Sequence, residues 1–225
     1  MTEREFKDRL SRRARKANLA IKGPLGDKLW TYFQLLAKWN QKINLTGLDL
    51  DEPTQEGLDR LLIEPLLAAP FANGASTLID IGSGGGSPAL PLALALPGVR
   101  LVMIEVKTRK SVFLREAARE LGLAATVETS RHETLLSKPS FHEAFDVLSV
   151  RAVRVEVKIF AALQSFVRPG GRILHFTTAS ESPALLPPPL EALGTHGLDD
   201  SGRSQLLVIG KREERSTWNI SLPRH

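Results

Sequence analysis

Cysteine is absent from the 225 residues of this sequence, and histidine occurs only five times, at scattered positions. The absence of cysteine excludes disulfides, thiolate metal sites and thiol nucleophiles. Five scattered histidines are a poor set of metal ligands, so we expect no metal site. A reducing compartment, such as a bacterial cytoplasm, is consistent with this composition.

Long apolar runs are absent too. No stretch reaches the roughly 18 uninterrupted apolar residues of a membrane-spanning helix. The longest candidate, Pro88 to Val99, is too short and contains three prolines. Residues 1–23 also lack the apolar core of a secretory signal peptide. We therefore predict a cytoplasmic protein without a membrane partner.

Positive charge is concentrated at the amino terminus. The chain has a formal net charge of +5, and residues 1–22 hold eight Lys and Arg residues against three acids. A basic segment of this kind attracts phosphate backbones, which predicts contact with RNA. A solvated helix face is the alternative interpretation, and the composition is compatible with both.

Short apolar strands alternate with helical stretches from residue 77 onward. We predict strands at Thr77–Ile81, Arg100–Glu105, Thr126–Glu128, Phe145–Val150, Arg172–Phe176 and Gln205–Gly210. Helices are predicted at Pro88–Ala95, Thr108–Leu121 and Val155–Phe166. This alternation indicates an α/β fold with a parallel sheet covered on both faces. Residues 180–204, with three consecutive prolines, indicate an irregular excursion before a last strand that runs antiparallel.

Two helical segments precede the alternating region. Residues 26–47 carry apolar side chains at helical spacing, and residues 51–71 predict a second helix that breaks near Pro65. We therefore divide the chain into two parts. Residues 1–72 form a basic segment and a helical cap, and residues 73–225 form the main domain.

The stretch "LIDIGSGGGSPALPLALAL" joins the first predicted strand to a helix through a glycine turn. Gly82, Gly84 and Gly86 permit positive φ and close approach of the backbone to a ligand. Ser87 is a candidate cap of the following helix. Ligands bind at such turns because they lie at the carboxyl ends of parallel strands.

The acids near this turn distinguish between candidate ligands. The negative charge of Asp80 would oppose the pyrophosphate of a nicotinamide dinucleotide and favour a cation. S-adenosylmethionine carries an ammonium and a sulfonium and has no phosphate, so D-x-G-x-G-x-G from Asp80 to Gly86 suits it better. Glu105 ends the next strand, 21 residues beyond Gly84, where a carboxylate can accept both ribose hydroxyls. A solvated acid at a strand end is the alternative for Glu105.

Several stretches occur in the order typical of one family: "LLAKWNQKINLTG", the glycine turn, "RKSVFLREAARELGL", "TSRHETL", "FDVLSVRAV" and "RPGG". They resemble the small-subunit ribosomal RNA guanine-N7 methyltransferases, the RsmG (GidB) family, over most of residues 27–177. The resemblance implies a doubly wound, mostly parallel, seven-stranded Rossmann-like sheet, with an N-terminal helical cap and an antiparallel last strand. It also implies S-adenosylmethionine as cofactor and ribosomal RNA or the small ribosomal subunit as partner. We expect a monomer.

The resemblance further implies roles for single residues. Gly82 and the position of Ser87 lie where the family holds the methionine part of the cofactor, and Asp80, Gly84 and Gly86 of the same turn are expected to contact the cofactor as well. Glu105 takes the ribose, His132 and Glu133 flank the adenine, and Arg151 lies across the methyl-transfer end. His132 could instead be a surface histidine. Arg151 could bind an RNA phosphate or the cofactor carboxylate, stack on the base, or pair with Asp146 or Glu156.

The second cap helix departs from the family pattern R-H-x-x-D-S. Arg60 matches, but Leu61 replaces histidine, Glu64 replaces aspartate and Pro65 replaces serine. Val150 likewise replaces the serine of S-R-A. These positions lie toward the expected substrate side, so the sequence predicts the cofactor more firmly than the acceptor.

The predicted reaction is methyl transfer to N7 of a guanine in small-subunit (16S) ribosomal RNA. N7 has an in-plane lone pair and no proton, so direct attack needs no general base, and alignment supplies most of the rate. One alternative is a methyltransferase with a different acceptor. The other is a non-catalytic RNA-binding or assembly protein that keeps the fold.

Overall fold

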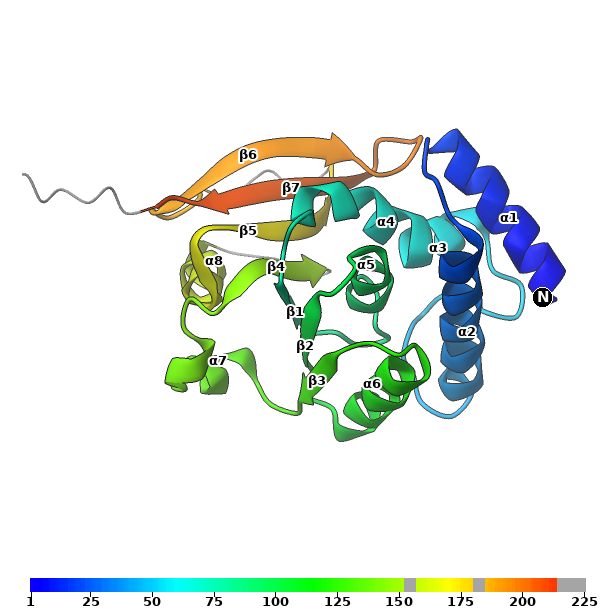
Figure 1. The fold of residues 1–225 in the computed structure, drawn as a ribbon, viewed down its shortest axis with the longest axis horizontal. Coiled ribbons are helices and arrows are strands. Elements are labelled where there is room, and N and C mark those ends of the chain that lie inside the picture. Colours follow the sequence, from blue (N-terminus) through cyan, green and yellow to red (C-terminus); the bar gives the residue numbers. More distant parts are fainter. Residues whose placement is uncertain (152–156, 180–184, 214–225) are drawn as a thin grey trace, which may run out of the picture.

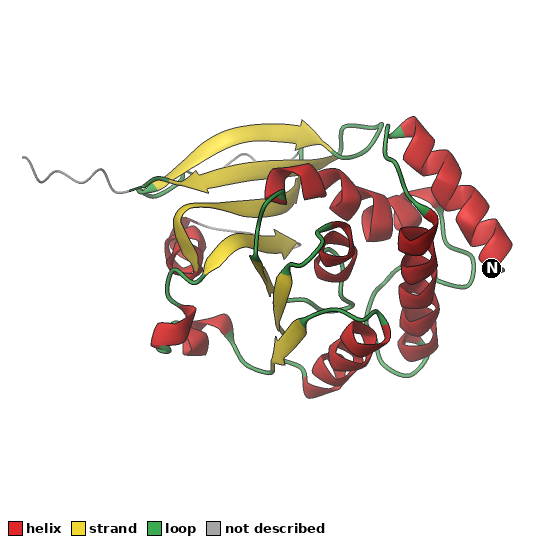
Figure 2. Cartoon of the chain, viewed as in Figure 1, coloured by secondary structure: helices red, strands yellow, loops and turns green. Residues whose placement is uncertain are grey.

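The computed structural model describes residues 1–151, 157–179 and 185–213. Its centre is a seven-stranded sheet in the order β3-β2-β1-β4-β5-β7-β6, visible in Figures 1 and 2. The pairings from β3 to β5 are parallel, and β7 runs antiparallel to both β5 and β6. The strands are β1 (Thr77–Ile81), β2 (Arg100–Ile104), β3 (Ala125–Glu128), β4 (Phe145–Arg151), β5 (Val167–Thr178), β6 (Leu190–Gly197) and β7 (Ser204–Lys211). The doubly wound, mostly parallel sheet predicted for this chain is confirmed.

All six strands predicted by position are present. Five of them differ from the prediction by at most one residue at either end, whereas β5 begins at Val167, five residues before the predicted Arg172. The prediction of an irregular excursion was wrong for one part of residues 180–204, because Leu190–Gly197 forms the edge strand β6. Its sequence, LEALGTHG, has few β-branched or aromatic residues and two glycines. Its register against β7 also shifts between Ala192 and Gly194. This segment therefore forms a strand because it pairs with β7, and not because its own residues favour a strand.

Helices cover both faces of the sheet (Figures 1 and 2). One face carries α1 (Glu3–Lys16), α2 (Gly23–Asn40), α3 (Gln55–Leu58), α4 (Glu64–Ala68), α5 (Ala89–Ala95) and α6 (Thr108–Glu120). The other face carries α7 (His132–Leu135) and α8 (Val157–Leu163). The predicted start of α8, at residues 155 and 156, lies outside the described residues. No described helix is long and apolar enough to cross a membrane.

Two apolar clusters fill the space between the helices and the sheet. One joins the N-terminal helices, α5 and α6 to the sheet through residues such as Phe33, Leu62 and Leu174. The other lies under α7 and α8 and contains Phe160 and Phe166. The predicted boundary at residue 72 falls in the turn before β1, and the division into two domains stays a prediction.

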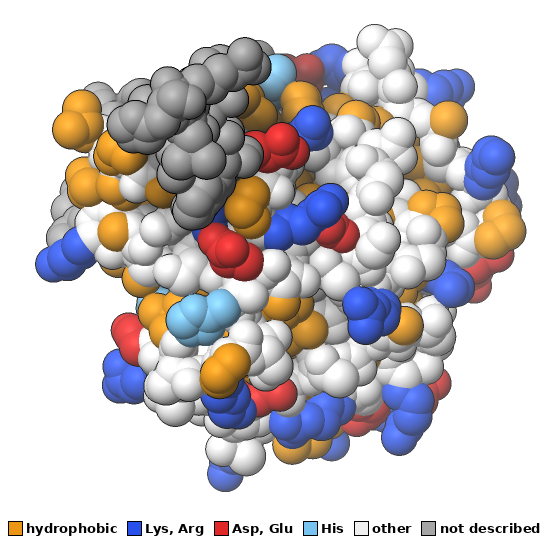
Figure 3. Space-filling model, turned by 60° about the vertical axis from the view of Figure 1, so that its left-hand side comes forward, with side chains coloured by type: hydrophobic (Ala, Val, Ile, Leu, Met, Phe, Trp, Pro, Cys, Tyr) orange, Lys and Arg blue, Asp and Glu red, His pale blue; other side chains and the backbone are white. Residues whose placement is uncertain are grey.

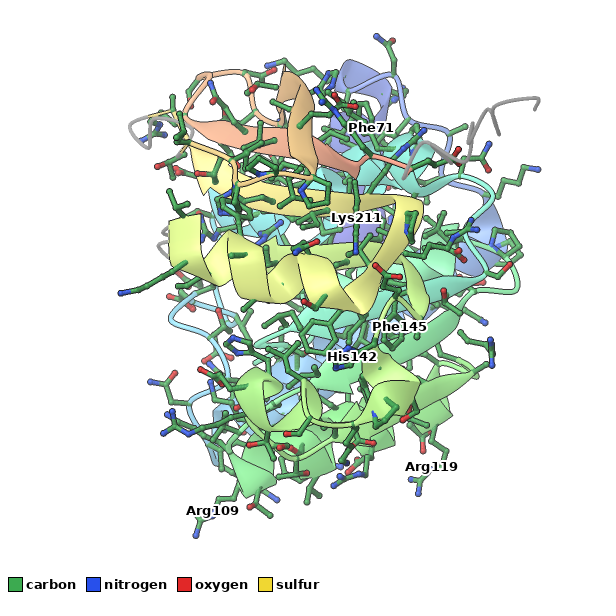
Figure 4. The ribbon with its side chains drawn as sticks, turned by 90° about the vertical axis from the view of Figure 1, so that its left-hand side faces the viewer. Phe71, Arg109, Arg119, His142, Phe145 and Lys211 are labelled. Atoms are coloured by element: carbon green, nitrogen blue, oxygen red, sulfur yellow. The ribbon has the colours of Figure 1, made fainter. Side chains whose placement is uncertain are left out.

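The end of the sheet opposite to the glycine turn is held by a buried lysine. Lys211 Nζ at the end of β7 lies 2.6 Å from Glu143 Oε1 and donates to the carbonyls of Gln164 and Val167 at 3.0 and 2.9 Å. Figure 4 shows Lys211 beside α8, while Arg109 and Arg119 of α6 point outward at the far edge of the molecule. Lys211 therefore links three segments on the side of the sheet away from the ligand turn.

Candidate active site

The glycine turn lies between β1 and α5 at the carboxyl end of the sheet. The strand order reverses between β1 and β4, and open α/β sheets bind ligands at such a switch point. Gly82, Gly84 and Gly86 have φ values of 74°, 51° and 90°, so all three lie in the region that favours glycine. A Cβ on Gly86 would also lie 2.5 Å from Leu90 Cδ1. The turn therefore requires glycine for its conformation and for its packing.

Gly85 lies against the N-terminal cap, which leaves little room for a side chain. A Cβ at this position would lie 3.2 Å from the carbonyl oxygen of Leu45 and 3.3 Å from Leu36 Cδ1. The Tyr32 hydroxyl donates to the Gly85 carbonyl at 2.7 Å. Helix α2 and the loop after it thus hold the glycine turn from the side away from the sheet.

Asp80 is a buried carboxylate with one free oxygen. Its side chain is 1% exposed, and Oδ1 accepts a hydrogen bond of 2.6 Å from the Ser149 hydroxyl of β4. Oδ2 has no hydrogen-bond partner among the described residues. Burial raises the pKa of Asp80 to about 6, and the Ser149 bond and the nearby Arg151 charge oppose this only in part. A buried acceptor beside the turn fits a cationic ligand group and would oppose a phosphate.

Glu105 follows β2 and connects it to the glycine turn. Its Oε2 accepts from the Gly84 amide at 2.9 Å, and its Oε1 accepts from the Lys107 amide at 2.8 Å. Each carboxylate oxygen keeps a second lone pair, so both can still accept a ribose hydroxyl. The alternative of a solvated acid is excluded, because Glu105 is only 8% exposed.

His132 and Glu133 begin α7, after the neighbouring strand β3. His132 Nδ1 lies 3.3 Å from Glu133 Oε2, and the histidine side chain is 23% exposed. The pair therefore stands at the carboxyl end of the sheet with polar atoms available. Its contact with an adenine ring stays a prediction.

Arg151 ends β4 and is buried against the cap. Its Nη1 donates to the Arg60 carbonyl at 2.5 Å, and its Nη2 lies 3.0 Å from Glu64 Oε2. The guanidinium carbon also lies 4.5 Å from the centre of the Phe176 ring. Burial lowers the pKa of Arg151 to about 10 although Glu64 acts in the opposite direction, so Arg151 stays protonated at neutral pH.

The carboxylate that pairs with Arg151 is therefore Glu64, the residue that replaces the aspartate of the family pattern. The suggested pairing with Asp146 was wrong, because that carboxylate lies at the other end of β4, where it pairs with Arg168 and accepts from the amides of Ser76 and Thr77. Glu156 lies outside the described residues.

Pro65 leaves two backbone carbonyls of the cap free to accept hydrogen bonds from Arg151 and Ser87. The chain before it makes a π-helical turn, Asp59–Ile63, in which the Glu64 amide donates to the Asp59 carbonyl. Proline has no N–H, so it cannot donate to the carbonyls of Arg60 or Leu61 in the preceding turn. The Arg60 carbonyl instead accepts from Arg151, and the Leu61 carbonyl accepts from the Ser87 hydroxyl at 2.9 Å.

Ser87 was expected to cap α5, and this was wrong. The N-cap residue is Pro88, and no side chain caps the helix. The Ser87 hydroxyl faces the cap because the Leu61 carbonyl is available there. Ser87 thus joins the glycine turn to the second cap helix.

A pocket of about 350 Å³ lies between the cap and the glycine turn. We call it the cap pocket. Its walls come from α2, the loop after α2, the π-helical turn, the glycine turn and the end of β4: Leu36, residues 45–48, Arg60, Leu61, Gly85, Ser87 and Arg151. Asp80, Glu105 and His132 are not among its lining residues, whereas Ser87 and Arg151, two other residues expected to contact the cofactor, are.

The loop that forms one wall of this pocket is closed by Asn40. Asn40 Oδ1 at the end of α2 accepts from the amides of Leu45 and Thr46 at 2.9 and 3.0 Å. The sequence alone did not show this role of the "WNQKINLT" stretch, which is to close the loop.

The sequence analysis also did not identify Ser149, the residue that donates to Asp80, although it stands only two residues before Arg151.

Part of the basic amino terminus is neutralised within the protein. Lys7 lies 2.6 Å from Asp27, Arg13 lies 2.5 Å from Asp59, and Lys16 lies 2.6 Å from Asp200. Arg4, Arg12, Arg15 and Lys22 have no ion pair among the described residues. Figure 3 shows Lys and Arg side chains spread over one face of the molecule with acidic side chains between them. Charge for binding RNA is therefore available, but it is less concentrated than the sequence indicated.

Comparison with known proteins identifies the family of this chain. The model of the GidB family, described as rRNA small subunit methyltransferase G, matches residues 26–185. The chain belongs to the GidB family. A ribosomal RNA small subunit methyltransferase G from Neisseria gonorrhoeae is 37% identical over 169 residues, which are 72% of this chain and 72% of that protein. The protein of the same name from Myxococcus xanthus is 32% identical over 176 residues, which are 77% of this chain and 79% of that protein.

Solved structures support the fold of this GidB-family protein. A putative O-methyltransferase from Klebsiella pneumoniae has a TM-score of 0.61 at 15% identity, over 94% of this chain and 99% of that one. The putative methyltransferase yhhF from Escherichia coli has a TM-score of 0.55 at 14% identity, over 65% of this chain and 82% of that one. At these identities the likeness concerns the fold alone, which is that of the Rossmann-like methyltransferases.

Proposed function

We propose that this protein transfers a methyl group from S-adenosylmethionine to N7 of a guanine in small-subunit (16S) ribosomal RNA. Membership of the GidB family carries this proposal, and relatives named ribosomal RNA small subunit methyltransferase G match over about three quarters of the chain. Under this proposal the protein is a cytoplasmic monomer that acts on ribosomal RNA or on the small ribosomal subunit.

The residues at the carboxyl end of the sheet fit the cofactor. The free Oδ2 of Asp80 suits a cationic group, and the glycine turn admits close backbone approach. Glu105 has lone pairs for the ribose hydroxyls. The proposed cofactor residues are Asp80, Gly82, Gly84, Gly86, Ser87, Glu105, His132, Glu133 and Arg151.

Bound S-adenosylmethionine would supply an electrophilic methyl group on a positively charged sulfur. Guanine N7 has an in-plane lone pair and no proton, so the chain needs no general base. The contribution of the protein is then to hold N7 in line with the methyl group and to exclude water. Arg151 is the proposed catalytic residue, because it lies between the glycine turn and the cap and carries a full positive charge.

The test is methyl transfer from labelled S-adenosylmethionine to small ribosomal subunits that lack N7-methylguanosine, followed by nucleoside digestion. We expect labelled N7-methylguanosine with the wild-type protein and at least a roughly hundredfold loss with Arg151→Ala. Arg119→Ala, which removes a surface arginine that is 75% exposed, is the matched control and should keep full activity.

Two other results would replace the proposal. A labelled nucleoside other than N7-methylguanosine would indicate a different acceptor. Cofactor binding without any transfer would indicate a non-catalytic RNA-binding protein.

A further inference from the structure

Two segments of the chain carry basic residues and no acids. Residues 28–48, which contain most of α2 and the loop after it, have three lysines and no Asp or Glu. Residues 106–115, which contain the beginning of α6, have four Lys and Arg residues and no Asp or Glu. The positive charge is therefore not balanced within either segment.

The two segments meet because α2 and α6 pack against each other in opposite directions (Figure 1). Near the start of α2, Lys28 Nζ would lie 4.0 Å from a Cβ on Gly122, which follows the end of α6. Near the end of α2, the Trp39 ring contacts the Phe113 ring of α6 at 6.0 Å between centroids. The end of α2 therefore lies beside the beginning of α6.

Both segments also contact the glycine turn. The Lys107 amide donates to Glu105 Oε1 at 2.8 Å, and Glu105 Oε2 accepts from the Gly84 amide at 2.9 Å. On the other side, the loop after α2 places the Leu45 carbonyl against Gly85. The junction of α2 and α6 is therefore next to the turn proposed to hold the cofactor.

Five cationic side chains at this junction are not neutralised. None of them forms an ion pair among the described residues, and all are exposed or half-exposed. We call this group the basic surface. It consists of Lys38, Lys42, Lys107, Arg109 and Lys110.

Three of these cations do not stabilise the helix that carries them. Lys107, Arg109 and Lys110 lie at the beginning of α6, and its first turn contains no acid. The N-terminus of a helix is the positive end of its dipole, where acidic side chains are favourable and cations are not. The arrangement costs stability in the free protein, and a bound polyanion removes that cost.

We propose that the basic surface binds the phosphate backbone of the RNA that is methylated. Exposed Lys and Arg side chains bind such a backbone by charge, and these contacts position an RNA without reading its sequence. The inference rests on the proposed function. It places the RNA strand over the junction of α2 and α6, beside the glycine turn.

The other flank of the cap, formed by α1, suits RNA less well (Figure 1). Three of the basic residues of α1 are already paired with acids, as described above. A second pocket of about 390 Å³ beside Arg13 is lined by five acids: Glu56, Asp59, Glu64, Asp199 and Asp200. These carboxylates repel a phosphate backbone, so we expect the unpaired arginines of α1 to contribute little.

The test removes three cations of the basic surface together, in the variant Lys42→Gln, Arg109→Gln, Lys110→Gln. Binding to small ribosomal subunits that lack N7-methylguanosine is measured with S-adenosylhomocysteine present, at several salt concentrations. We expect the dissociation constant to rise at least roughly tenfold at about 0.1 M salt, and the slope of log K against log salt to fall by about 2. The dissociation constant of S-adenosylmethionine should change by less than about twofold, which shows that the variant is folded.

The matched control removes the same charge from α1, in the variant Arg4→Gln, Arg12→Gln, Arg15→Gln. All three arginines are exposed, and the control should keep the salt slope and bind subunits within about twofold of the wild type. Equal losses in the two triple variants overturn the proposal, because total charge alone then accounts for binding. A loss confined to the α1 variant overturns it too.

A single substitution gives the same answer if the triple variant does not fold. Lys42 lies in the loop after α2 and is exposed, so Lys42→Glu changes no helix. This charge reversal should weaken subunit binding at least roughly fivefold, and unchanged binding contradicts the proposal.

The two proposals fail differently. Wild-type protein that binds small subunits but makes no N7-methylguanosine refutes the proposed function and leaves the basic surface assigned. Wild-type turnover, with unchanged subunit binding by the Lys42, Arg109 and Lys110 variant, overturns the basic surface and leaves the proposed function standing.

Discussion

Replacing Asn40 with alanine should loosen the cap where it contacts the glycine turn. Asn40 Oδ1 is the acceptor for two backbone amides, those of Leu45 and Thr46, at 2.9 and 3.0 Å. These bonds close the loop whose Leu45 carbonyl lies against Gly85. Asn40→Ala removes both bonds at once.

The expected loss of stability follows from the number of bonds. One hydrogen bond contributes about 1 kcal/mol net, and a buried amide left without an acceptor costs somewhat more. We therefore expect the free energy of unfolding to fall by about 2 kcal/mol. For a chain of this size, this lowers the melting temperature by roughly 4–8 °C.

Urea unfolding and thermal melting measure this effect directly. Asn40→Asp is the matched control, because its carboxylate keeps an acceptor oxygen in the same place and should lose less than about half as much stability. We also expect weaker binding of S-adenosylmethionine by Asn40→Ala, since the loop supports the turn. An alanine variant as stable as the wild type, or an aspartate variant as weak as alanine, would refute this reasoning.

Three further predictions concern single buried polar side chains. The pKa of Asp80 is about 6 in the folded protein and about 4 when unfolded, so ionising it costs stability as pH rises from 4 to 6. Urea unfolding at both pH values should show that Asp80→Asn loses about 2 kcal/mol less than the wild type over this range. Glu105→Gln should weaken S-adenosylmethionine binding at least roughly tenfold by calorimetry, because the ribose loses a charged acceptor, and unchanged affinity would contradict the assignment. Lys211→Met should lower the free energy of unfolding by about 2–3 kcal/mol in urea, because it leaves two carbonyls and Glu143 without their donor, while cofactor affinity stays unchanged.

The sequence by itself determined the parts of the site that are close together along the chain. A strand, a glycine turn, a helix and a second strand ending in an acid predicted a ligand turn with Glu105 as an acceptor for the ribose. The structure places Glu105 beside that turn, where its Oε2 accepts from the Gly84 amide. Such contacts follow from strand periodicity and from the conformations that only glycine adopts. The same local patterns predicted six of the seven strands.

Only the tertiary structure decided which distant segments meet. The edge strand β6 depends on pairing with β7, and Arg151 takes Glu64 and the Arg60 carbonyl as partners, although the sequence suggested Asp146. The cap pocket likewise combines α2, the π-helical turn and β4. A buried charge pairs with whichever group packing brings within reach, and a carbonyl is free only if the donor in its own helix is missing, as at Pro65. Such partners are separated by 91 residues in the case of Arg60 and Arg151, and no local pattern encodes that distance.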